Sequence, residues 1–295
     1  MSRRTSTERC LGAAVVFGAN GFIGSHLGRA LRLAGYPVVP CASEVTPPPD
    51  TQTVYFMAGR VTPSGAAHHP EGVAAEVEAF RRVLGSLQCR STRPPRVVLA
   101  SSGGTVYAPS CQPPYREDHP TAPNNTYGLM KLEMESILRA QAGVEPVIVR
   151  LANVYGPGQQ ARRGLGVIAH WIDALGRGQP IALHGHLDTT RDYLYIDDAV
   201  DLLVRIHAAR DLPQILNAGS GTPTALAELA RLTLETSGRP DLLIRRAPAR
   251  AADRMHVWLD IGLARSTLGW VPRTSLREGL RRTWACAATS APTVA

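Results

Sequence analysis

The chain has 295 residues, 44% of them hydrophobic, and a formal net charge of +8. That apolar share is ample for a buried core, and no apolar run is long enough to span a membrane. The basic residues are scattered rather than gathered in blocks with interleaved aromatics, which argues against a nucleic-acid-binding protein. Five widely spaced cysteines without a CxxC pair predict reduced thiols in a cytoplasmic protein and no metal site.

Strand and helix patterns alternate along the first half of the chain. Short apolar runs predict strands over residues 13–17, 37–42, 53–59 and 96–100, and a strand that leads into a loop over 146–156. Apolar residues at helical spacing predict helices over 25–34, 71–87 and 126–140. This alternation favours an α/β fold with a doubly wound parallel sheet that has helices on both faces. Beyond about residue 160 the rhythm loosens, which predicts a smaller C-terminal lobe that carries specificity.

A glycine-rich turn joins the first predicted strand to the first predicted helix. Gly18, Gly21 and Gly24 form a GxxGxxG pattern there. Such glycines allow a tight turn and let backbone N–H groups approach a pyrophosphate at the helix N-terminus. A plain βα turn can also be rich in glycine, but the flanking strand and helix favour a dinucleotide site.

The adenosine end of that site departs from the usual pattern. A carboxylate is expected near Ala42, and Glu44 is the nearest substitute. Only the segment SEVTPPPDTQT separates the second predicted strand from the third, which is too short for a helical crossover. We therefore expect the first half of the fold to be shortened by one βα unit.

Lys131 is the only lysine of the chain and stands four residues after Tyr127. Side chains at this spacing share one face of a helix. A neighbouring cation lowers the pKa of a tyrosine from its ordinary value of about 10. A surface lysine on an ordinary helix is the alternative, but retention of a single lysine at this spacing favours a catalytic pair.

The chain resembles the extended short-chain dehydrogenase/reductases that modify nucleotide sugars, from about Val15 to Trp284. The landmarks stand in the family's order: GANGFIGSHL, VYFMAG, SSGGTVY, YGLMK, RLANVYGPGQ, RDYLYIDDAV, LNAGSG and LGWVPRTSLREGLRRTW. The resemblance implies a Rossmann-type NAD(P)-binding domain over 1–160 plus about 189–219. It implies a substrate-binding lobe over about 161–188 and 220–295.

The resemblance also assigns roles. Tyr127 is the implied proton donor or acceptor, and Lys131 tunes it and holds the cofactor ribose. The implied cofactor-binding residues are these two with Gly18, Asn20, Gly21, Phe22, Ile23, Gly24 and Ala58.

One position of the family's catalytic set is altered. Gly103 stands where the family has a Ser or Thr, so Ser102 or Thr105 is expected to supply the hydroxyl, with Ser102 favoured. The 4,6-dehydratases have an Asp-Glu pair where this chain has Gly104 and Thr105. That subclass is therefore not expected.

For the substrate, the resemblance implies a nucleotide-diphosphate sugar held by Asn153, Arg191 and Arg250. An ion pair with Asp192 or Asp197 is the alternative role of Arg191. The family commonly dimerises through helices that match 71–87 and 126–140, so a homodimer is expected.

These expectations combine into a reductase of an NDP-4-ketohexose that uses NAD or NADP, with NADPH favoured. The alternative is an NAD-dependent 4-epimerase, and a more distant one is a cofactor-sensing pseudoenzyme. The reductase is preferred because the adenosine end is predicted to be poorly held. An epimerase gains from never releasing its cofactor, whereas a reductase must exchange it.

Overall fold

The computed structural model describes residues 12–41, 46–59, 61–87, 94–161, 166–239, 244–247 and 254–290. Its centre is a six-stranded sheet in the order β10-β5-β4-β3-β1-β2, with all neighbours parallel. The predicted α/β class with a parallel sheet is confirmed. The strands are β1 (Ala13–Phe17), β2 (Val38–Cys41), β3 (Thr51–Phe56), β4 (Arg96–Ser102), β5 (Glu145–Leu151) and β10 (Ile215–Ala218).

The predicted loss of one βα unit is visible at the β2 edge. Strand β2 ends at Cys41 and β3 begins at Thr51, and β1 pairs directly with both strands. The described part of this connection, residues 46–50, contains no helix. Ala42 and Glu44, which bear on the missing carboxylate, lie outside the described residues.

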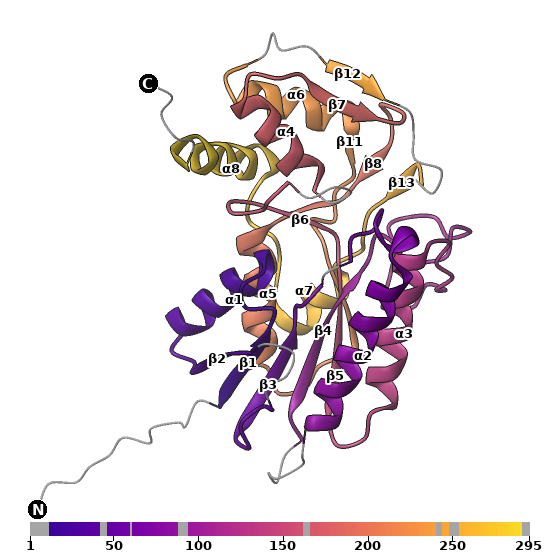
Figure 1. Ribbon diagram of the computed structural model, residues 1–295, viewed down its shortest axis with the longest axis vertical. Helices are drawn as coiled ribbons and strands as arrows, with labels where there is room; N and C mark the ends of the chain where they lie inside the picture. Colours follow the sequence, from indigo (N-terminus) through magenta and orange to yellow (C-terminus); the bar gives the residue numbers. More distant parts are fainter. Residues whose placement is uncertain are drawn as a thin grey trace, which may run out of the picture.

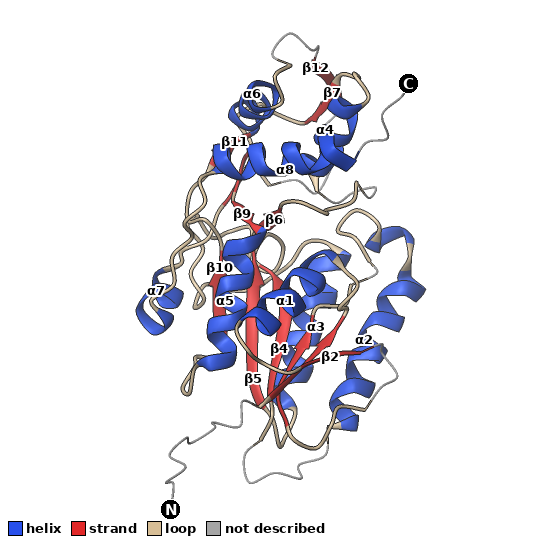
Figure 2. Ribbon diagram, turned by 90° about the vertical axis from the view of Figure 1, so that its left-hand side faces the viewer, coloured by secondary structure: helices blue, strands red, loops and turns tan. Residues whose placement is uncertain are grey.

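Two pairs of helices cover the sheet (Figures 1 and 2). On one face, α1 (Phe22–Leu33) packs against α5 (Ile196–Ala208), and both contribute to one hydrophobic cluster. On the other face, α2 (Pro70–Ser86) packs against α3 (Thr126–Ala140). The apolar stripe of α2 faces the sheet, where Val77, Phe80 and Val83 are buried. The stripe therefore contributes to the core beneath the helix.

A smaller group of elements lies beyond the carboxyl ends of the strands (Figure 1). It comprises α4 (Val167–Gly176), β7 (Ile181–His184), β8 (Thr190–Arg191), β11 (Thr224–Ala225), α6 (Leu226–Thr236), β12 (Ile244–Ala247), β13 (His256–Val257) and α8 (Leu276–Ser290). Strand β6 (Asn153–Tyr155) pairs with β9 (Tyr193–Tyr195) between this group and the sheet. The short helices are η1 (Ala66–His68) and α7 (Gly262–Leu268).

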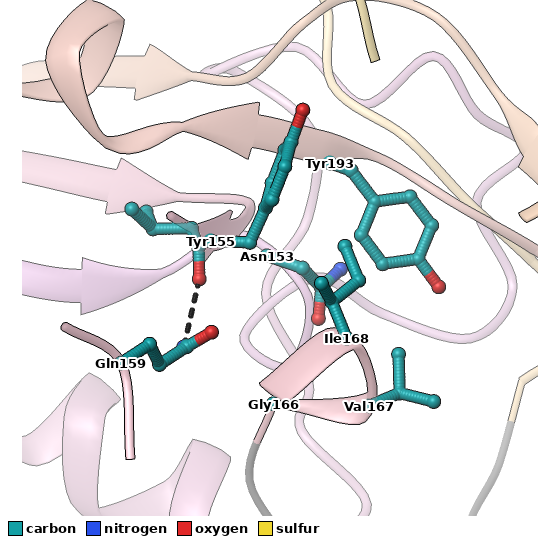
Figure 3. A pocket seen from close by; sticks show the side chains of 8 residues that line it. Asn153, Tyr155, Gln159, Gly166, Val167, Ile168 and Tyr193 are labelled. Atoms are coloured by element: carbon teal, nitrogen blue, oxygen red, sulfur yellow. Dashed lines mark hydrogen bonds between the residues drawn. The ribbon is translucent and has the colours of Figure 1, made fainter. Parts of the chain in front are cut away.

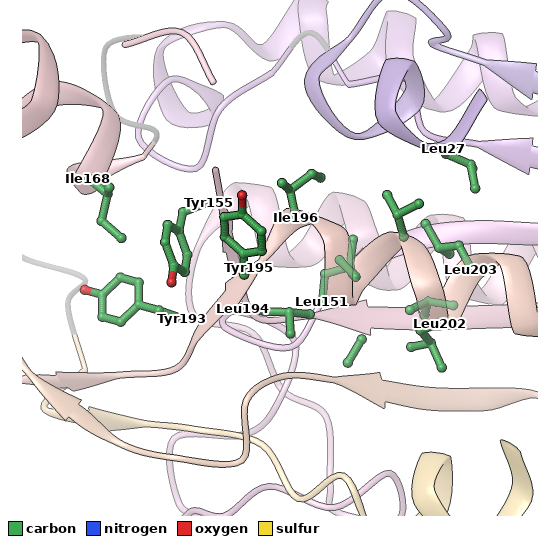
Figure 4. Packing of buried hydrophobic residues seen from close by; sticks show 14 of the residues in the cluster. Leu27, Leu151, Tyr155, Ile168, Tyr193, Leu194, Tyr195, Ile196, Leu202 and Leu203 are labelled. Carbon is green, nitrogen blue, oxygen red and sulfur yellow. The ribbon is translucent and has the colours of Figure 1, made fainter. Parts of the chain in front are cut away.

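One hydrophobic cluster runs from the sheet into this smaller group. Figure 4 shows Tyr155, Tyr193 and Tyr195 between Ile168 of α4 and Leu203 of α5. These side chains are buried, so the two parts share a core. Within the described ranges, no helix is both long and apolar enough to cross a bilayer.

His207, near the end of α5, is fully buried against the sheet. Its ring centroid lies 4.3 Å from that of Tyr36 and 6.4 Å from that of Tyr55. Burial lowers the pKa of His207 to about 4. In the unfolded chain the His207 imidazole takes up a proton near pH 6.5. The contribution of neutral His207 to the free energy of unfolding is therefore fully present above that pH and is lost as pH falls toward 4.

We predict that His207→Phe makes the protein less sensitive to acid. Between about pH 7 and pH 4.5, the variant should lose about 2 kcal/mol less free energy of unfolding than the wild type. Denaturant unfolding at the two pH values measures this. His184→Gln, at an exposed position of β7, is the matched control and should behave like the wild type. Equal acid sensitivity in all three chains would contradict a buried neutral imidazole.

Candidate active site

Helix α3 carries the predicted catalytic pair in its first two turns. Asn125 caps the helix, and its side-chain oxygen accepts a hydrogen bond from the Gly128 N–H at 2.8 Å. Tyr127 and Lys131 lie on one face, with Nζ 5.5 Å from the centroid of the phenol ring. The structure thus brings the two residues together as the spacing predicts, while their roles stay predictions.

Lys131 is buried and ion-paired. Its Nζ lies 3.1 Å from Oε1 of Glu76 on α2, and both side chains are 5% exposed. Burial by itself lowers the pKa of Lys131, but the acidic groups of Tyr127 and Glu76 outweigh burial and raise the pKa above the ordinary lysine value. The ammonium is therefore charged at neutral pH despite its burial.

Glu76 was not singled out from the sequence. It lies three residues after Val73 and four before Phe80, so it sits on the apolar stripe of α2. An acidic residue within an apolar stripe could have indicated its importance, because a buried carboxylate needs a partner. Its second oxygen accepts a hydrogen bond from the Val61 N–H at 3.2 Å.

The loop after β4 faces the N-terminal end of α3. A Cβ on Gly128 would lie 2.7 Å from the Thr105 carbonyl oxygen, so this glycine lets α3 approach the loop closely. The Thr105 hydroxyl is buried and has no hydrogen-bond partner among the described residues. Ser102, the favoured candidate, ends β4 and is half-buried. An orphaned buried hydroxyl has more to gain from a bound oxygen, which favours Thr105 over Ser102.

The absence of a side chain at Gly103 is explained by packing. A Cβ there would meet Cδ1 of Leu259 at 2.6 Å and Cδ2 at 2.8 Å. Leu259 is 1% exposed and packs with Tyr107 and Tyr115. Leu259 thus fills the space that a serine or threonine side chain at Gly103 would need.

The glycine turn fits a pyrophosphate. Gly18 has a φ of +86° and abuts Ala58, where a Cβ on Gly18 would lie 2.7 Å from the Ala58 nitrogen. Helix α1 has Gly21 as its N-cap, no side-chain cap hydrogen bond and no acidic residue in its first turn. Its N–H groups and dipole therefore suit an anion.

The other predicted cofactor residues lie around this turn. Asn20 is exposed in the turn itself. Phe22 and Ile23 begin α1 and are partly buried against the core. His26, one turn further, places Nε2 3.0 Å from the Pro157 carbonyl oxygen, which ties α1 to the loop after β6. The cofactor turn and the predicted substrate region are thus neighbours.

The predicted substrate residues lie beside that loop. Asn153 donates its side-chain N–H to the Asp192 carbonyl oxygen at 2.9 Å and lines a small pocket (Figure 3). Arg191 donates to the carbonyl oxygens of Thr190 at 2.9 Å and Met255 at 3.4 Å. Arg250 lies outside the described residues. The pocket is lined by Asn153, Val154, Tyr155, Gln159, Gly166, Val167, Ile168 and Tyr193.

A pair of aspartates at the start of a helix often caps it, but Asp197 and Asp198 do not cap α5. Both residues lie in the first turn of α5, whose N-cap is Tyr195 without a side-chain cap hydrogen bond. The Asp198 carboxylate instead accepts hydrogen bonds from the N–H groups of Arg273 at 2.9 Å and Thr274 at 3.0 Å. Among the residues with described positions, no cluster of His, Cys, Asp or Glu could hold a metal ion.

A model of the NAD dependent epimerase/dehydratase family matches residues 43–219. The chain belongs to this family. A dTDP-6-deoxy-L-talose 4-dehydrogenase (NAD(P)(+)) of Kitasatospora kifunensis is 29% identical, over 93% of this chain and 95% of that enzyme. A UDP-glucose 4-epimerase of Mycolicibacterium smegmatis is 35% identical, over 64% of this chain and 61% of that enzyme.

Solved structures agree with this membership. MoeE5 in complex with UDP-glucose and NAD is 31% identical, with 95% of this chain and 99% of that chain covered and a TM-score of 0.81. The predicted family and its Rossmann-type fold are therefore confirmed. The relatives act on different substrates, so membership alone does not choose among their reactions.

We predict that Gly103 and Leu259 are coupled. Gly103→Ser should lower the free energy of unfolding by about 1–3 kcal/mol through overpacking, and Leu259→Ala by about 2–5 kcal/mol through a cavity. The double variant should be more stable than the sum of the two losses implies, by at least about 1 kcal/mol. Gly104→Ser is the control, because a Cβ there has its nearest neighbour at 3.9 Å. Additive losses in denaturant unfolding would refute the packing explanation.

Proposed function

We propose that this protein is an NAD(P)H-dependent reductase that acts on the C4 ketone of a nucleotide-linked hexose or deoxyhexose. The observation that carries the proposal is the Tyr127–Lys131 pair, with a charged, buried ammonium beside the phenol. The 4-dehydrogenase and the UDP-glucose 4-epimerase described above are named for nucleotide sugars, which supports this substrate class. The Kitasatospora kifunensis enzyme, a 4-dehydrogenase, supports redox chemistry at C4.

In the proposed reaction a nicotinamide cofactor, when bound, would supply the hydride that the carbonyl carbon at C4 accepts. Tyr127 gives its hydroxyl proton to the carbonyl oxygen, which becomes the C4 hydroxyl, and regains a proton from solvent. Lys131 stabilises the tyrosinate left behind. Thr105 or Ser102 donates a hydrogen bond that orients the carbonyl, and the orphaned hydroxyl supports Thr105 for this role.

The turn of Gly18, Gly21 and Gly24 seats the pyrophosphate of the cofactor in this proposal. Its fit rests on the uncapped N-terminus of α1 and on the close approach of Gly18 to Ala58. Asn153, Arg191 and Arg250 are the proposed contacts to the nucleotide sugar. The short link between β2 and β3 supports exchange of the cofactor in each turnover, because it leaves less protein around the adenosine. We further propose a cytoplasmic homodimer.

We predict that Lys131→Arg loses activity but keeps the fold. The wider guanidinium retains the charge but does not fit the buried space beside Tyr127 and Glu76. The turnover number should fall by about 100-fold, which corresponds to about 2.7 kcal/mol of barrier. Steady-state kinetics and a melting curve measure the two effects. Activity within about threefold of the wild type would make the lone lysine a coincidence of composition.

The test that separates a reductase from a 4-epimerase is the cofactor content of the purified protein. A reductase should arrive largely free of nucleotide and should need added NAD(P)H for every turnover. Denaturation followed by chromatography measures the released nucleotide. Near-stoichiometric NAD, together with turnover without added cofactor, would overturn the reductase and identify a 4-epimerase.

A further inference from the structure

Glu76 is an interior carboxylate to which the proposed reaction gives no role. Its Oε1 lies 3.1 Å from Lys131 Nζ, and its Oε2 accepts a hydrogen bond from the Val61 N–H. Desolvation of two buried charges offsets most of their attraction, so stability alone is a weak reason for keeping such a pair. Its contact with Lys131, the neighbour of Tyr127, points to a role in the chemistry.

Lys131 is the neighbour that Tyr127 and Glu76 share. Lys131 Nζ lies 5.5 Å from the Tyr127 ring centroid and 3.1 Å from Oε1 of Glu76. The Glu76 oxygen is therefore no farther from the ring centroid than the sum of these two distances. At that range inside a protein, a unit charge shifts the pKa of a neighbour by about one unit or more. Glu76 is negative and therefore opposes the loss of the Tyr127 proton, whereas Lys131 favours it.

We propose that Glu76 is a positioning residue that sets the protonation of the catalytic pair. It fixes the Lys131 ammonium in place and offsets part of the positive charge that acts on Tyr127. A proton donor must carry its proton when the ketone binds, so this arrangement suits reduction. The inference rests on the proposed function for the identity of the reaction but not for the electrostatics.

Two other ionisable groups of the neighbouring elements are engaged elsewhere or exposed. Glu135 of α3 belongs to a separate buried ion pair, and His68 of η1 is exposed and hydrogen-bonds to a backbone carbonyl. Among the residues that the structure describes, Tyr127 and Glu76 are the neighbours whose charges act on Lys131. A change at Glu76 should therefore be visible at Lys131 without interference from another carboxylate.

The single lysine makes this directly measurable. Selective ¹⁵N-lysine labelling yields one Nζ signal, and its NMR titration reports Lys131 alone. In the wild type the ammonium signal should persist to the highest pH at which the fold survives. In Glu76→Gln it should titrate at least about one pH unit lower. Glu78→Gln is the matched control, with the same substitution on the same helix at a side chain 58% exposed, and should match the wild type.

The second readout is the ionisation of Tyr127 itself. The tyrosinate absorbance of each chain is compared with that of its Tyr127→Phe counterpart, so that the difference belongs to Tyr127. We expect Tyr127 to ionise about one pH unit lower in Glu76→Gln than in the wild type. The alkaline limb of the reduction rate should move by the same amount, because the rate falls as the donor loses its proton.

An unchanged Lys131 titration, or a Tyr127 that ionises at the same pH in Glu76→Gln, would overturn the inference. If Glu76→Gln does not fold, two results decide. Glu76→Asp keeps the charge and should leave the titrations of Lys131 and Tyr127 close to those of the wild type. A wild-type Lys131 Nζ that titrates at or below about pH 10.4 would refute the Lys131–Glu76 ion pair. Neither titration needs substrate. A chain that reduces no nucleotide-sugar ketone would therefore refute the proposed function and leave the result on Glu76 standing.

Discussion

A single ammonium group kept charged inside the protein is the constraint on which the rest of the site depends. Lys131 can remain protonated at 5% exposure only because acidic groups stand next to it. Helix α3 supplies Tyr127 one turn before it, and α2 supplies Glu76 from the neighbouring helix. The packing of these two helices on one face of the sheet therefore does more than bury apolar surface, since it brings together the three groups on which the proposed proton transfer depends.

The strand ends that meet α3 are held by a second buried ion pair. Arg150 of β5 reaches Glu135 of α3 at 2.7 Å, with both side chains essentially unexposed, and Ser101 of β4 donates to the same carboxylate at 2.5 Å. The Arg150 guanidinium also stacks 4.8 Å above the Tyr107 ring, in the loop after β4. These contacts join β4, β5, α3 and the loop that carries Thr105.

The smaller group of elements is fixed to this framework by another buried carboxylate. Asp192 accepts hydrogen bonds from the N–H groups of Ser220 at 2.6 Å and Leu259 at 3.2 Å, and burial raises its pKa. It thereby positions Leu259 against Gly103 and holds the backbone beside Asn153. The shape of the site around the proposed carbonyl thus depends on residues far apart in sequence.

Local patterns predicted the framework well. The strand at Ala13–Phe17 and the helix at Thr126–Ala140 were predicted with their observed bounds, because apolar period and capping act over a few residues. Glu76 and Leu259 were missed, since their importance comes from partners 55 and more than 100 positions away that only the tertiary fold brings close. The role of Asp198 could not be predicted for the same reason, because its carboxylate accepts hydrogen bonds from Arg273 and Thr274, in the segment before α8.

We propose above that Tyr127, with a bound nicotinamide cofactor, reduces a nucleotide-sugar ketone at C4. The most direct measurement supplies NAD(P)H deuterated at nicotinamide C4 and locates the deuterium in the product by NMR. The account predicts one deuterium on C4 of the sugar with the wild type and essentially none in the same time with Tyr127→Phe. Deuterium at another carbon, turnover without transfer of the label, or an equal rate with Tyr127→Phe would contradict it.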